Sequence, residues 1–454
     1  MKEVYIAVDY GGGSGRVMAG SFCHGQLELE TISRFGNRQV RMGGHTYWDF
    51  LALFQDMKEG LRMAVRKGYR IKSIGIDTWG VDFGLIDRRG NLLGNPICYR
   101  DQFTAGLPEE LFGGGKATEH YAVAGIQIMP INTIYQLYGL KREGDVRLEV
   151  ADKLLFMPDL FSYFLTGLAN NEYSIASTSE LLDASNRTWN RKLIGELGLP
   201  QHLFGEIVMP GSSRGTLRPE VAAEIGIDYP VEVIAVGSHD TASAIRALPP
   251  VKREGTRRAF LSSGTWSLLG IELDQPILTE DARLAGFTNE GGVGGKICFM
   301  QNITGLWILQ RLRAQWEEEG KETDYGVLIA EAEKSGITSV IDVDAPEFQN
   351  PDRMEQTIAG HCRATGQPVP ATQGDYMLCI VQSLAARYKR GIDELNRLTG
   401  QPVEELCIIG GGNQNRLLNR LTQEALGIPV VSGPVEATAI GNILVQAEAF
   451  ESRR

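Results

Sequence analysis

The sequence is short of cysteine, of long hydrophobic runs and of positive charge, and each shortage excludes a class of protein. Its six cysteines are scattered with no Cys-x-x-Cys pair, which argues against a metal cluster. No run approaches the ~20 apolar residues that a membrane-spanning helix needs, so we expect no membrane span. The formal net charge of −11 argues against a nucleic-acid partner, because phosphate backbones require basic faces. A small anionic ligand is compatible with this charge, since it needs only a local nest of N–H groups.

We also expect no targeting segment at the start of the sequence. The apolar stretch Met1–Val8 ends at Asp9 and is far shorter than the hydrophobic core of a secretory signal. We therefore expect a cytoplasmic protein, in whose reducing surroundings disulfides are uncommon. Cys362 and Cys379 are predicted to end one helical stretch and begin the next, which leaves a bridge between them open. These features leave the oligomeric state undetermined.

Length and composition indicate a globular α/β enzyme of more than one domain. A chain of 454 residues is too long for a single core, and 43 % hydrophobic with 22 % charged residues is ordinary for such an enzyme. The polar, proline-containing stretch 249–255 is the predicted boundary, which gives domains 1–248 and 249–454. Strands are predicted over Val4–Val8, Arg16–Phe22, Leu27–Phe35, Ile71–Asp77, Ala259–Leu261, Trp266–Glu272 and Glu405–Ile409. Helices are predicted over Leu51–Lys67, Ile303–Glu319, Asp375–Leu398 and Pro434–Ala449.

Two common phosphate-binding fingerprints are absent. The string nearest to a Walker A loop, at 113–117, has Glu110 in place of the first glycine and Ala117 in place of the hydroxyl residue. A dinucleotide-binding loop is excluded at the N-terminus, because Arg16 replaces its last glycine and a strand follows where a helix is required.

Three other turns rich in small residues, each after an apolar strand, predict a different phosphate site. In the first, Asp9–Arg16, glycines let N–H groups point into one concavity, and Gly12, Gly13, Ser14, Gly15 and Arg16 are the candidate phosphate contacts. Asp9 is the candidate ligand for hydrated Mg²⁺, which uses few carboxylates. The second turn, 262–267, offers three hydroxyls, and the third, 410–415, offers bare backbone to a base or ribose. Each alone also fits an ordinary turn, but the three together favour an ATP site.

Asp240 is the candidate catalytic base. It follows the apolar strand and small-residue turn 233–239 and precedes a predicted helix, so capping that helix is the structural alternative. A sugar hydroxyl is a poor nucleophile, and attack on a γ-phosphoryl group requires an acceptor for its proton. The neighbouring His239 is interpreted as a hydrogen-bond donor to substrate, because it lacks partners at metal-ligand spacing.

The order of these turns resembles the FGGY family of carbohydrate kinases, in the superfamily of actin, sugar kinases and heat-shock ATPases. The resemblance runs from about residue 4 to residue 449 and is most specific in the strings 75–83 (Gly-Ile-Asp-Thr-Trp-Gly-Val-Asp-Phe), 99–101, 132–137, 288–292 and 433–438. It implies two ribonuclease-H-like domains with a catalytic cleft between them, the sugar mainly on the first and ATP mainly on the second. It also implies Mg²⁺-dependent phosphorylation of the ketose L-rhamnulose at O1.

The resemblance also implies roles for individual residues. Asp240 accepts the proton of the terminal hydroxyl, and Gly80, His239, Thr241 and Asn302 bind the sugar. The residues implied to contact ATP are Gly12, Gly13, Ser14, Gly15, Arg16, Thr265, Gln310 and Gly411. Gly13 departs from the family pattern, which often has a small hydroxyl residue or alanine there, so the loop is expected to be looser.

Two alternatives remain. One is an FGGY kinase for another ketose, such as L-fuculose or xylulose, with the same phosphate machinery and a different sugar pocket. The other is an ATP-gated interaction protein similar to actin or the heat-shock chaperones, which requires no sugar pocket. The run His239-Asp240-Thr241 disfavours the second, because such a protein needs a positioned water where a base for a sugar hydroxyl stands.

Overall fold

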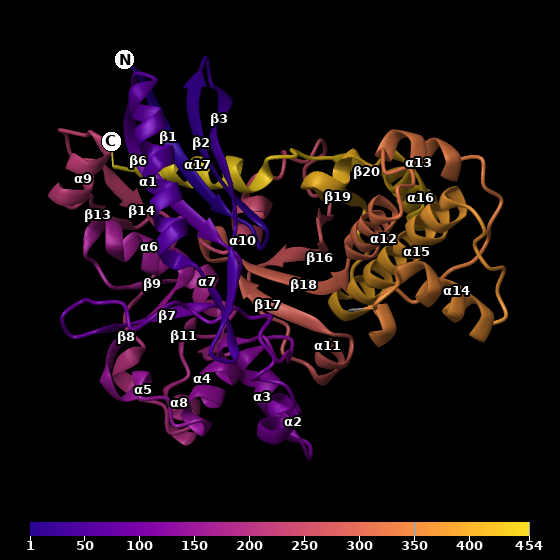
Figure 1. Cartoon of the computed structure of the whole chain (residues 1–454), viewed down its shortest axis with the longest axis horizontal. Coiled ribbons are helices and arrows are strands. Elements are labelled where there is room, and N and C mark those ends of the chain that lie inside the picture. The colour runs from indigo at the N-terminus through magenta and orange to yellow at the C-terminus, as the bar shows by residue number, and fades with distance from the viewer. Residues whose placement is uncertain (349–350, 454) are drawn as a thin grey trace. The chain divides into compact units, whose positions relative to one another are not determined.

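The computed structural model describes residues 1–348 and 351–453, and two six-stranded sheets organise it (Figure 1). The first sheet has the order β13-β14-β6-β1-β2-β3, with strands β1 (Lys2–Tyr10), β2 (Ser14–Cys23), β3 (Gln26–Gly36), β6 (Tyr69–Thr78), β13 (Ser213–Thr216) and β14 (Glu232–Ile234). The predicted meander is confirmed, because β1 pairs with β2 and β2 with β3 in antiparallel fashion. β6 runs parallel to both β1 and β14.

The second sheet repeats this design. Its order is β17-β18-β16-β15-β19-β20, with strands β15 (Arg258–Ser263), β16 (Trp266–Leu273), β17 (Phe287–Gly291), β18 (Ile297–Thr304), β19 (Glu405–Ile409) and β20 (Val430–Ser432). β15 pairs antiparallel with β16 and parallel with β19, as β1 does with β2 and β6. The orders β3-β2-β1-β6-β14 and β18-β16-β15-β19-β20 thus correspond, which is the ribonuclease-H-like arrangement.

Helices and short strands cover and connect the sheets. The helices before the second sheet are α1 (Phe50–Arg66), α2 (Leu107–Phe112), α3 (Lys116–Ala124), α4 (Thr133–Arg142), α5 (Arg147–Val150), α6 (Met157–Thr166), α7 (Tyr173–Ser177), α8 (Arg191–Glu196), α9 (Pro219–Ile225) and α10 (Asp240–Arg246). The helices that follow β15 and β16 in the chain are α11 (Glu280–Leu284), α12 (Trp307–Glu318), α13 (Tyr325–Ala332), α14 (Met354–Ala364), α15 (Gln373–Thr399), α16 (Arg416–Leu426) and α17 (Ala437–Glu451). The short strands are β4 (Gln39–Met42), β5 (His45–Trp48), β7 (Phe83–Asp87), β8 (Ala151–Phe156), β9 (Asn171–Glu172), β10 (Leu182–Asp183), β11 (Thr188–Trp189) and β12 (Ile207–Val208).

One predicted helix begins later than its sequence pattern suggests. α12 starts at Trp307, while Ile303 and Thr304 still belong to β18. Gly305 separates the two elements, and a Cβ added there would lie 2.6 Å from the Ser267 hydroxyl and 2.7 Å from its backbone nitrogen. The chain leaves the strand at a glycine that packs on the neighbouring backbone, and only then does the helix form.

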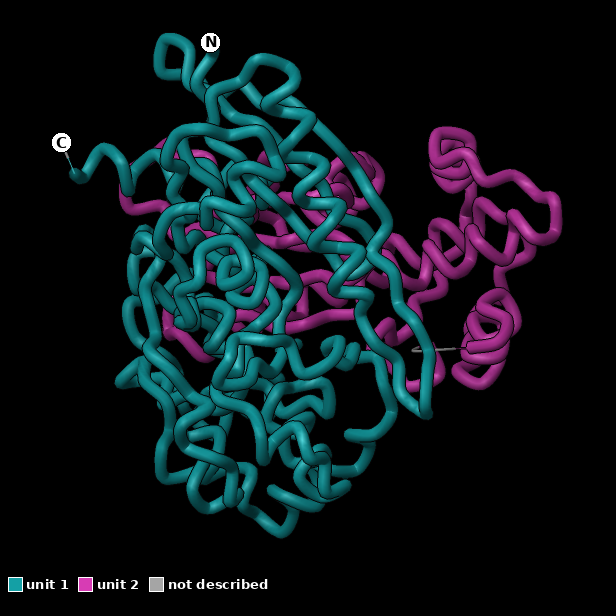
Figure 2. The backbone as a smooth tube through the Cα atoms, turned by 60° about the vertical axis from the view of Figure 1, so that its left-hand side comes forward, with its two compact units in different colours: residues 1–247, 272–299, 437–454 teal, residues 248–271, 300–436 magenta. Residues whose placement is uncertain are grey.

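The chain divides into two compact units that interleave along the sequence (Figure 2). Unit 1 comprises 1–247, 272–299 and 437–454, and unit 2 comprises 248–271 and 300–436. The predicted domains 1–248 and 249–454 are two consecutive stretches of sequence, whereas each unit is made of separate stretches. The chain passes from one unit to the other within β16 and again within β18. In unit 1, α17 returns to lie beside β1 and β6 (Figure 1), where Ile443 packs with Tyr5 and Ala7.

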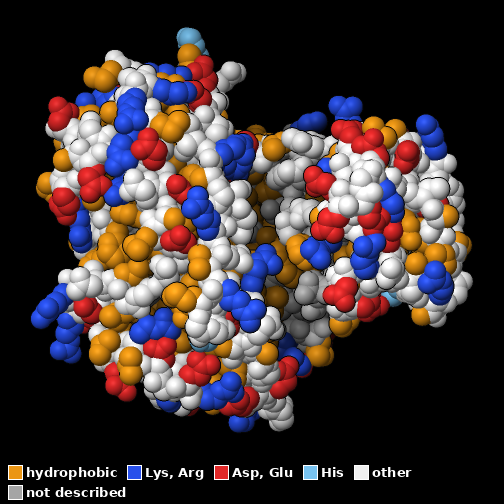
Figure 3. All heavy atoms as spheres, in the orientation of Figure 1, with side chains coloured by type: hydrophobic (Ala, Val, Ile, Leu, Met, Phe, Trp, Pro, Cys, Tyr) orange, Lys and Arg blue, Asp and Glu red, His pale blue; other side chains and the backbone are white. Residues whose placement is uncertain are grey.

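In residues 1–348 and 351–453, no helix combines the length and apolar character needed to cross a bilayer. Acidic and basic side chains are interspersed over the face drawn in Figure 3. All six cysteines are free thiols, including Cys362 and Cys379, so the open alternative of a bridge between these two is not realised.

Candidate active site

Asp240 lies where the turn after β14 enters α10. The end of β6 holds this turn, since Thr78 pairs with His239 and the Thr78 N–H donates to the Ser238 carbonyl at 2.9 Å. The N-cap of α10 is His239, and Asp240 is the first helical residue, so the capping interpretation of Asp240 is wrong. Its side chain keeps 32 % of its surface exposed and accepts a hydrogen bond from the Thr241 hydroxyl at 3.2 Å. The Asp240 carboxylate can therefore contact groups outside α10.

Two further carboxylates lie near Asp240 in unit 1. Asp9 and Asp77 are paired across the parallel strands β1 and β6, and both are buried. Burial raises the pKa of Asp77 well above its usual value and the charge of Asp9 adds to this, while a hydrogen bond from Asn442 Nδ2 at 2.6 Å opposes it. Burial also raises the pKa of Asp240, with His239 opposing and Asp9 adding to the rise. An acidic cluster thus occupies one end of the first sheet.

His239 lies between two carboxylates. Its Nδ1 is 3.0 Å from Glu290 Oε2, and its Nε2 is 3.5 Å from Asp240 Oδ1. Burial lowers the pKa of His239, but the charge and hydrogen bond of Glu290 and the charge of Asp240 raise it to about 8. The backbone of the same turn is held separately, because His239 N–H donates to the Ser174 hydroxyl at 3.1 Å.

Gly80 and Thr178 lie beside the His239 ring. A Cβ added at Gly80 would be 3.2 Å from Thr178 Cγ2 and 3.4 Å from His239 Nε2, so the absence of a side chain keeps this surface open. The next residue, Val81, has a φ of 67°, which is rare for a branched side chain and costs about 1–3 kcal/mol. Two hydroxyls hold this residue in place. The Thr178 hydroxyl accepts a hydrogen bond from Val81 N–H at 3.0 Å, and the Thr133 hydroxyl donates one to the Val81 carbonyl at 2.6 Å. The structure thus maintains a strained turn next to His239, as is common where ligands bind.

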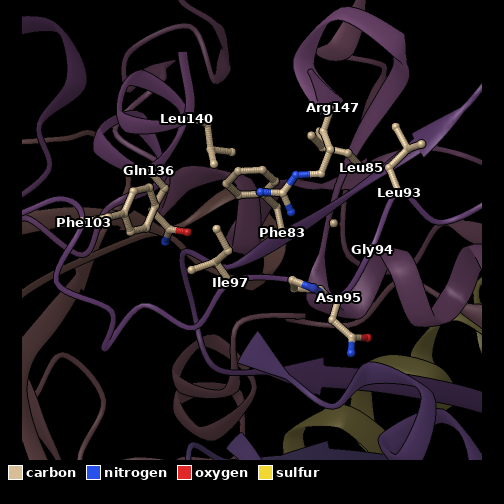
Figure 4. A pocket seen from close by; sticks show the side chains of 12 residues that line it. Phe83, Leu85, Leu93, Gly94, Asn95, Ile97, Phe103, Gln136, Leu140 and Arg147 are labelled. Carbon is tan, nitrogen blue, oxygen red and sulfur yellow. The ribbon is translucent and has the colours of Figure 1, made fainter. Parts of the chain in front are cut away.

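The side chain of Asp82 supports this turn from inside the core. It accepts hydrogen bonds from Trp48 Nε1 at 2.6 Å, Trp79 Nε1 at 2.9 Å and Gln136 Nε2 at 2.9 Å. Burial raises the pKa of Asp82 to about 6, and these donors limit the rise. Gln136 also lines a cavity of unit 1 together with Phe83, Ile97 and Leu140, into which the Arg147 guanidinium points (Figure 4).

The first glycine-rich turn connects β1 to β2. Gly11 N–H donates to the Ser14 carbonyl at 2.9 Å, and Asn37 donates from its side chain to the Gly11 carbonyl, also at 2.9 Å. Arg16 donates to Asp9 Oδ2 from two nitrogens, at 2.8 and 2.6 Å. The predicted magnesium ligand and a predicted phosphate contact are therefore ion-paired with each other.

Three of the predicted nucleotide contacts, Thr265, Gln310 and Gly411, lie in unit 2. The Thr265 hydroxyl donates to Gln310 Oε1 at 3.1 Å, and Trp307 N–H donates to the Thr265 carbonyl at 3.2 Å. The turn after β19 packs on the same loop, because a Cβ added at Gly412 would lie 2.0 Å from the Ser263 hydroxyl. At Gly411 an added Cβ would meet nothing within 4 Å, so this glycine faces open space. The loop after β15 thus contacts both the start of α12 and the turn after β19 within unit 2.

Each predicted site residue belongs to one of two groups. Asp9, Gly12, Gly13, Ser14, Gly15, Arg16, Gly80, His239, Asp240 and Thr241 lie in unit 1, and Thr265, Asn302, Gln310 and Gly411 lie in unit 2. Asn302, predicted to bind the sugar, is on β18 in the same unit as the predicted nucleotide contacts Thr265, Gln310 and Gly411. Sequence reasoning missed Glu290, Glu172 and Asn442. β17 has the sequence Phe-Thr-Asn-Glu-Gly and is buried along its whole length, so the signal available for Glu290 was its place in the family-like string 288–292.

The carboxylates of unit 1 fit a hydrated divalent cation. In the part of the chain that the structure describes, no three histidine, cysteine or acidic side chains are grouped closely enough to enclose a metal ion. Mg²⁺ does not require such a cage, because it keeps several waters and is bound by one or two carboxylates together with substrate phosphates. Asp77 Oδ1 is buried without a hydrogen-bond partner, and Asp9 and Asp77 are neighbours across the strands, so the donor set suits this ion.

Replacing Gly80 with alanine is expected to weaken ligand binding in unit 1. The added methyl group would enter the space between Thr178 and His239, so we expect the dissociation constant of a sugar ligand to rise by roughly 10- to 200-fold. Isothermal titration calorimetry measures this directly. The matched control is Gly36→Ala, because a Cβ there meets nothing within 4 Å. Equal affinities for the Gly80 variant and the control would contradict the prediction.

Comparison with known proteins matches most of the chain to one family. Residues 4–246 match the N-terminal domain, and residues 259–450 the C-terminal domain, of the FGGY family of carbohydrate kinases. A rhamnulokinase of Bacteroides thetaiotaomicron is 47 % identical over 98 % of this chain and 91 % of its own length. A rhamnulokinase of Oceanobacillus iheyensis is 37 % identical over 99 % of this chain and 94 % of its own. The solved xylulose kinase of Lactobacillus acidophilus shares the fold, with a TM-score of 0.82 at 15 % identity over 99 % of this chain and 90 % of that one.

Proposed function

The chain belongs to the FGGY family of carbohydrate kinases, and we propose that it transfers the γ-phosphoryl group of ATP to O1 of L-rhamnulose. The observation that carries this proposal is the 47 % identity to a rhamnulokinase over 98 % of the chain. The predicted alternative of an actin-like or chaperone-like interaction protein is disfavoured, because both family domains are those of carbohydrate kinases.

The proposed reaction gives Asp240 the role of general base. The bond from O1 of the ketose to the γ-phosphorus forms while the bond to the ADP oxygen breaks, and Asp240 takes the proton that O1 loses. The raised pKa of Asp240 suits this role, since a base of higher pKa holds the proton more strongly once it has accepted it. The remaining catalysis consists of positioning and of donors around the γ-oxygens.

The sugar is proposed to bind mainly residues of unit 1, and the nucleotide residues of both units. Gly80, His239 and Thr241 form the sugar surface, with Asn302 contributing from β18. Gly12, Gly13, Ser14, Gly15 and Arg16 contact the phosphates together with Thr265, while Gln310 and Gly411 support the nucleoside. In this proposal residues 1–248 are mainly sugar-binding and 249–454 mainly nucleotide-binding. Asp9 would hold Mg²⁺ through its waters, and the ion would neutralise charge on the phosphates.

We also propose that the enzyme acts in the cytoplasm. ATP is available there, and reducing conditions keep thiols free, which is the state of all six cysteines.

The function is tested by ADP release coupled to a spectroscopic readout, across a panel of L-rhamnulose, L-fuculose, L-ribulose and D-xylulose. We expect the highest kcat/KM with L-rhamnulose. A higher value with another ketose would assign that sugar instead, and ADP release independent of any sugar would contradict the kinase proposal.

A pair of glycine variants tests the nucleotide surface. Gly411→Ala is expected to raise KM for ATP by roughly tenfold, because its methyl group enters open space that the adenosine would occupy, and to leave unfolding unchanged. Gly412→Ala is expected to lower the free energy of unfolding by about 1–3 kcal/mol, because Ser263 must move. ATP kinetics and urea unfolding separate the two effects. An unchanged KM for Gly411→Ala would remove that residue from the site.

A further inference from the structure

Glu290 approaches the candidate site from a different strand and has no role in the reaction described above. It lies on β17, buried, with its carboxylate 3.0 Å from Nδ1 of His239. Residues on either side hold the strand within unit 1. Gly291 N–H donates to the Ser177 hydroxyl at 2.7 Å, and Asn289 N–H to the Gly125 carbonyl at 2.9 Å. The carboxylate is therefore presented to the imidazole by a fixed backbone.

The two carboxylates beside the His239 ring determine which of its nitrogens carry protons. Glu290 Oε2 is buried, has no other hydrogen-bond partner among the described residues and lies 3.0 Å from Nδ1, so a bare Nδ1 would set its lone pair against those of the carboxylate, and a proton on Nδ1 removes this repulsion. If Nε2 were the bare nitrogen of a neutral ring, its lone pair would face the Asp240 carboxylate at 3.5 Å, which is repulsive. With protons on both nitrogens the ring is a cation that donates toward a carboxylate on each side. Nε2 is also the atom that a Cβ on Gly80 would approach to 3.4 Å, so this second N–H faces the proposed sugar surface.

We propose that Glu290 is a positioning residue that keeps His239 doubly protonated, so that Nε2–H serves as a charged donor to an oxygen of the sugar. This inference rests on the proposed function, and it adds a residue that fixes the charge state of the sugar-binding histidine.

The charged groups that face His239 all favour the cation. Glu290 comes from β17, Asp240 from the start of α10, and Glu172 from the end of β9, and each raises the pKa of His239, while burial lowers it. Glu172 also binds the backbone of the turn, accepting from Ser238 N–H at 3.2 Å. Burial raises the pKa of Glu172 to about 7, so its charge is partly lost near neutrality, whereas Glu290 makes the direct contact with the ring.

The pH dependence follows from the sign of this shift. A histidine whose pKa is raised holds its charge below that pKa and loses it as the pH rises through it. With a pKa of about 8 against the ordinary 6.5, His239 remains a cation at neutral pH. We expect kcat/KM for the ketose to fall above about pH 8 in the unaltered enzyme, and the fall to move toward pH 6.5 in Glu290→Gln.

The experiment compares the pH profile of kcat/KM for the ketose in the two proteins at saturating ATP. For Glu290→Gln we expect a loss on the order of tenfold at pH 8 and activity within about twofold of the unaltered enzyme at pH 6. Glu272→Gln, which removes the same charge from the exposed side of β16, is the matched control and is expected to keep the original profile. A loss that is equal at every pH indicates a merely structural role and would overturn the proposal, as would an unshifted basic limb.

A second readout does not depend on activity. The chain has six histidines, so the imidazole signal of His239 can be identified in ¹⁵N NMR spectra by its disappearance in His239→Gln. We expect this ring to titrate near pH 8 in the ligand-free protein and closer to pH 6.5 in Glu290→Gln. An ordinary titration in the unaltered protein would overturn the inference even if the enzyme is an active kinase. An absence of kinase activity with a normal shift would instead contradict the proposed function alone.

Discussion

Asp240→Asn is expected to reduce kcat by roughly 10²–10⁴-fold, the usual contribution of a general base. The amide has nearly the same shape as the carboxylate and still offers an oxygen to the Thr241 hydroxyl, which now donates to Asp240 Oδ1 at 3.2 Å. Ketose affinity is therefore expected to change little, while the proton of O1 loses its acceptor. Steady-state ADP release and calorimetric titration of the ketose separate the two effects.

The matched control for this variant is Asp228→Asn, which removes an exposed carboxylate of unit 1. We expect this control to retain the kcat of the unaltered enzyme, because Asp228 lies outside the proposed machinery. A kcat for Asp240→Asn within about tenfold of the control would contradict the assignment of Asp240 as the base.

The largest effect on stability is expected from Arg214→Met. Arg214, on β13, is 1 % exposed, and its Nη1 lies 2.7 Å from Oδ1 of the fully buried Asp159 on α6. Its other nitrogens donate to Asn170, at 3.0 Å to the side chain and 2.6 Å to the carbonyl. Removing one partner of a buried pair leaves the other charge without compensation, so we expect the free energy of unfolding to fall by about 3–5 kcal/mol.

Urea unfolding followed by circular dichroism measures this loss. Arg88→Met is the matched control, because Arg88 is 88 % exposed and 4.0 Å from its partner Asp152, and such surface pairs contribute only about 0–1 kcal/mol. The double variant Arg214→Met with Asp159→Leu is expected to recover much of the stability, since it removes both buried charges. A loss for Arg214→Met no larger than that of the control would contradict the prediction.

This buried pair also supports the candidate site. Asp159 Oδ1 accepts from Glu172 N–H at 3.1 Å, and Glu172 in turn accepts from Ser238 N–H, which immediately precedes His239. Burial raises the pKa of Asp159 to about 6, and the charge of Arg214 limits the rise. We therefore expect Arg214→Met to affect activity as well, through the position of the turn that carries Asp240.

The amino-acid sequence alone determined the elements whose signals are local. Apolar stretches between turns predicted the strands of the β1–β2–β3 meander, and clusters of glycine and hydroxyl residues predicted the turns at 9–16, 262–267 and 410–415. Asp240 could be selected as a candidate base because its strand, turn and helix are contiguous in the sequence. The start of α12 was predicted too early, since the apolar spacing of 303–319 does not reveal that β18 continues to Thr304.

Only the tertiary structure decided which groups surround these candidates. Asn442 donates to Asp77 across 365 residues of sequence, and Glu290 reaches His239 from a separate strand, so neither contact leaves a local pattern. The charge state of His239 and the raised pKa values of Asp77 and Asp240 depend on burial and on neighbouring charges, which exist only after the chain has folded. Local patterns thus located the candidate base, whereas long-range packing set its electrostatic surroundings.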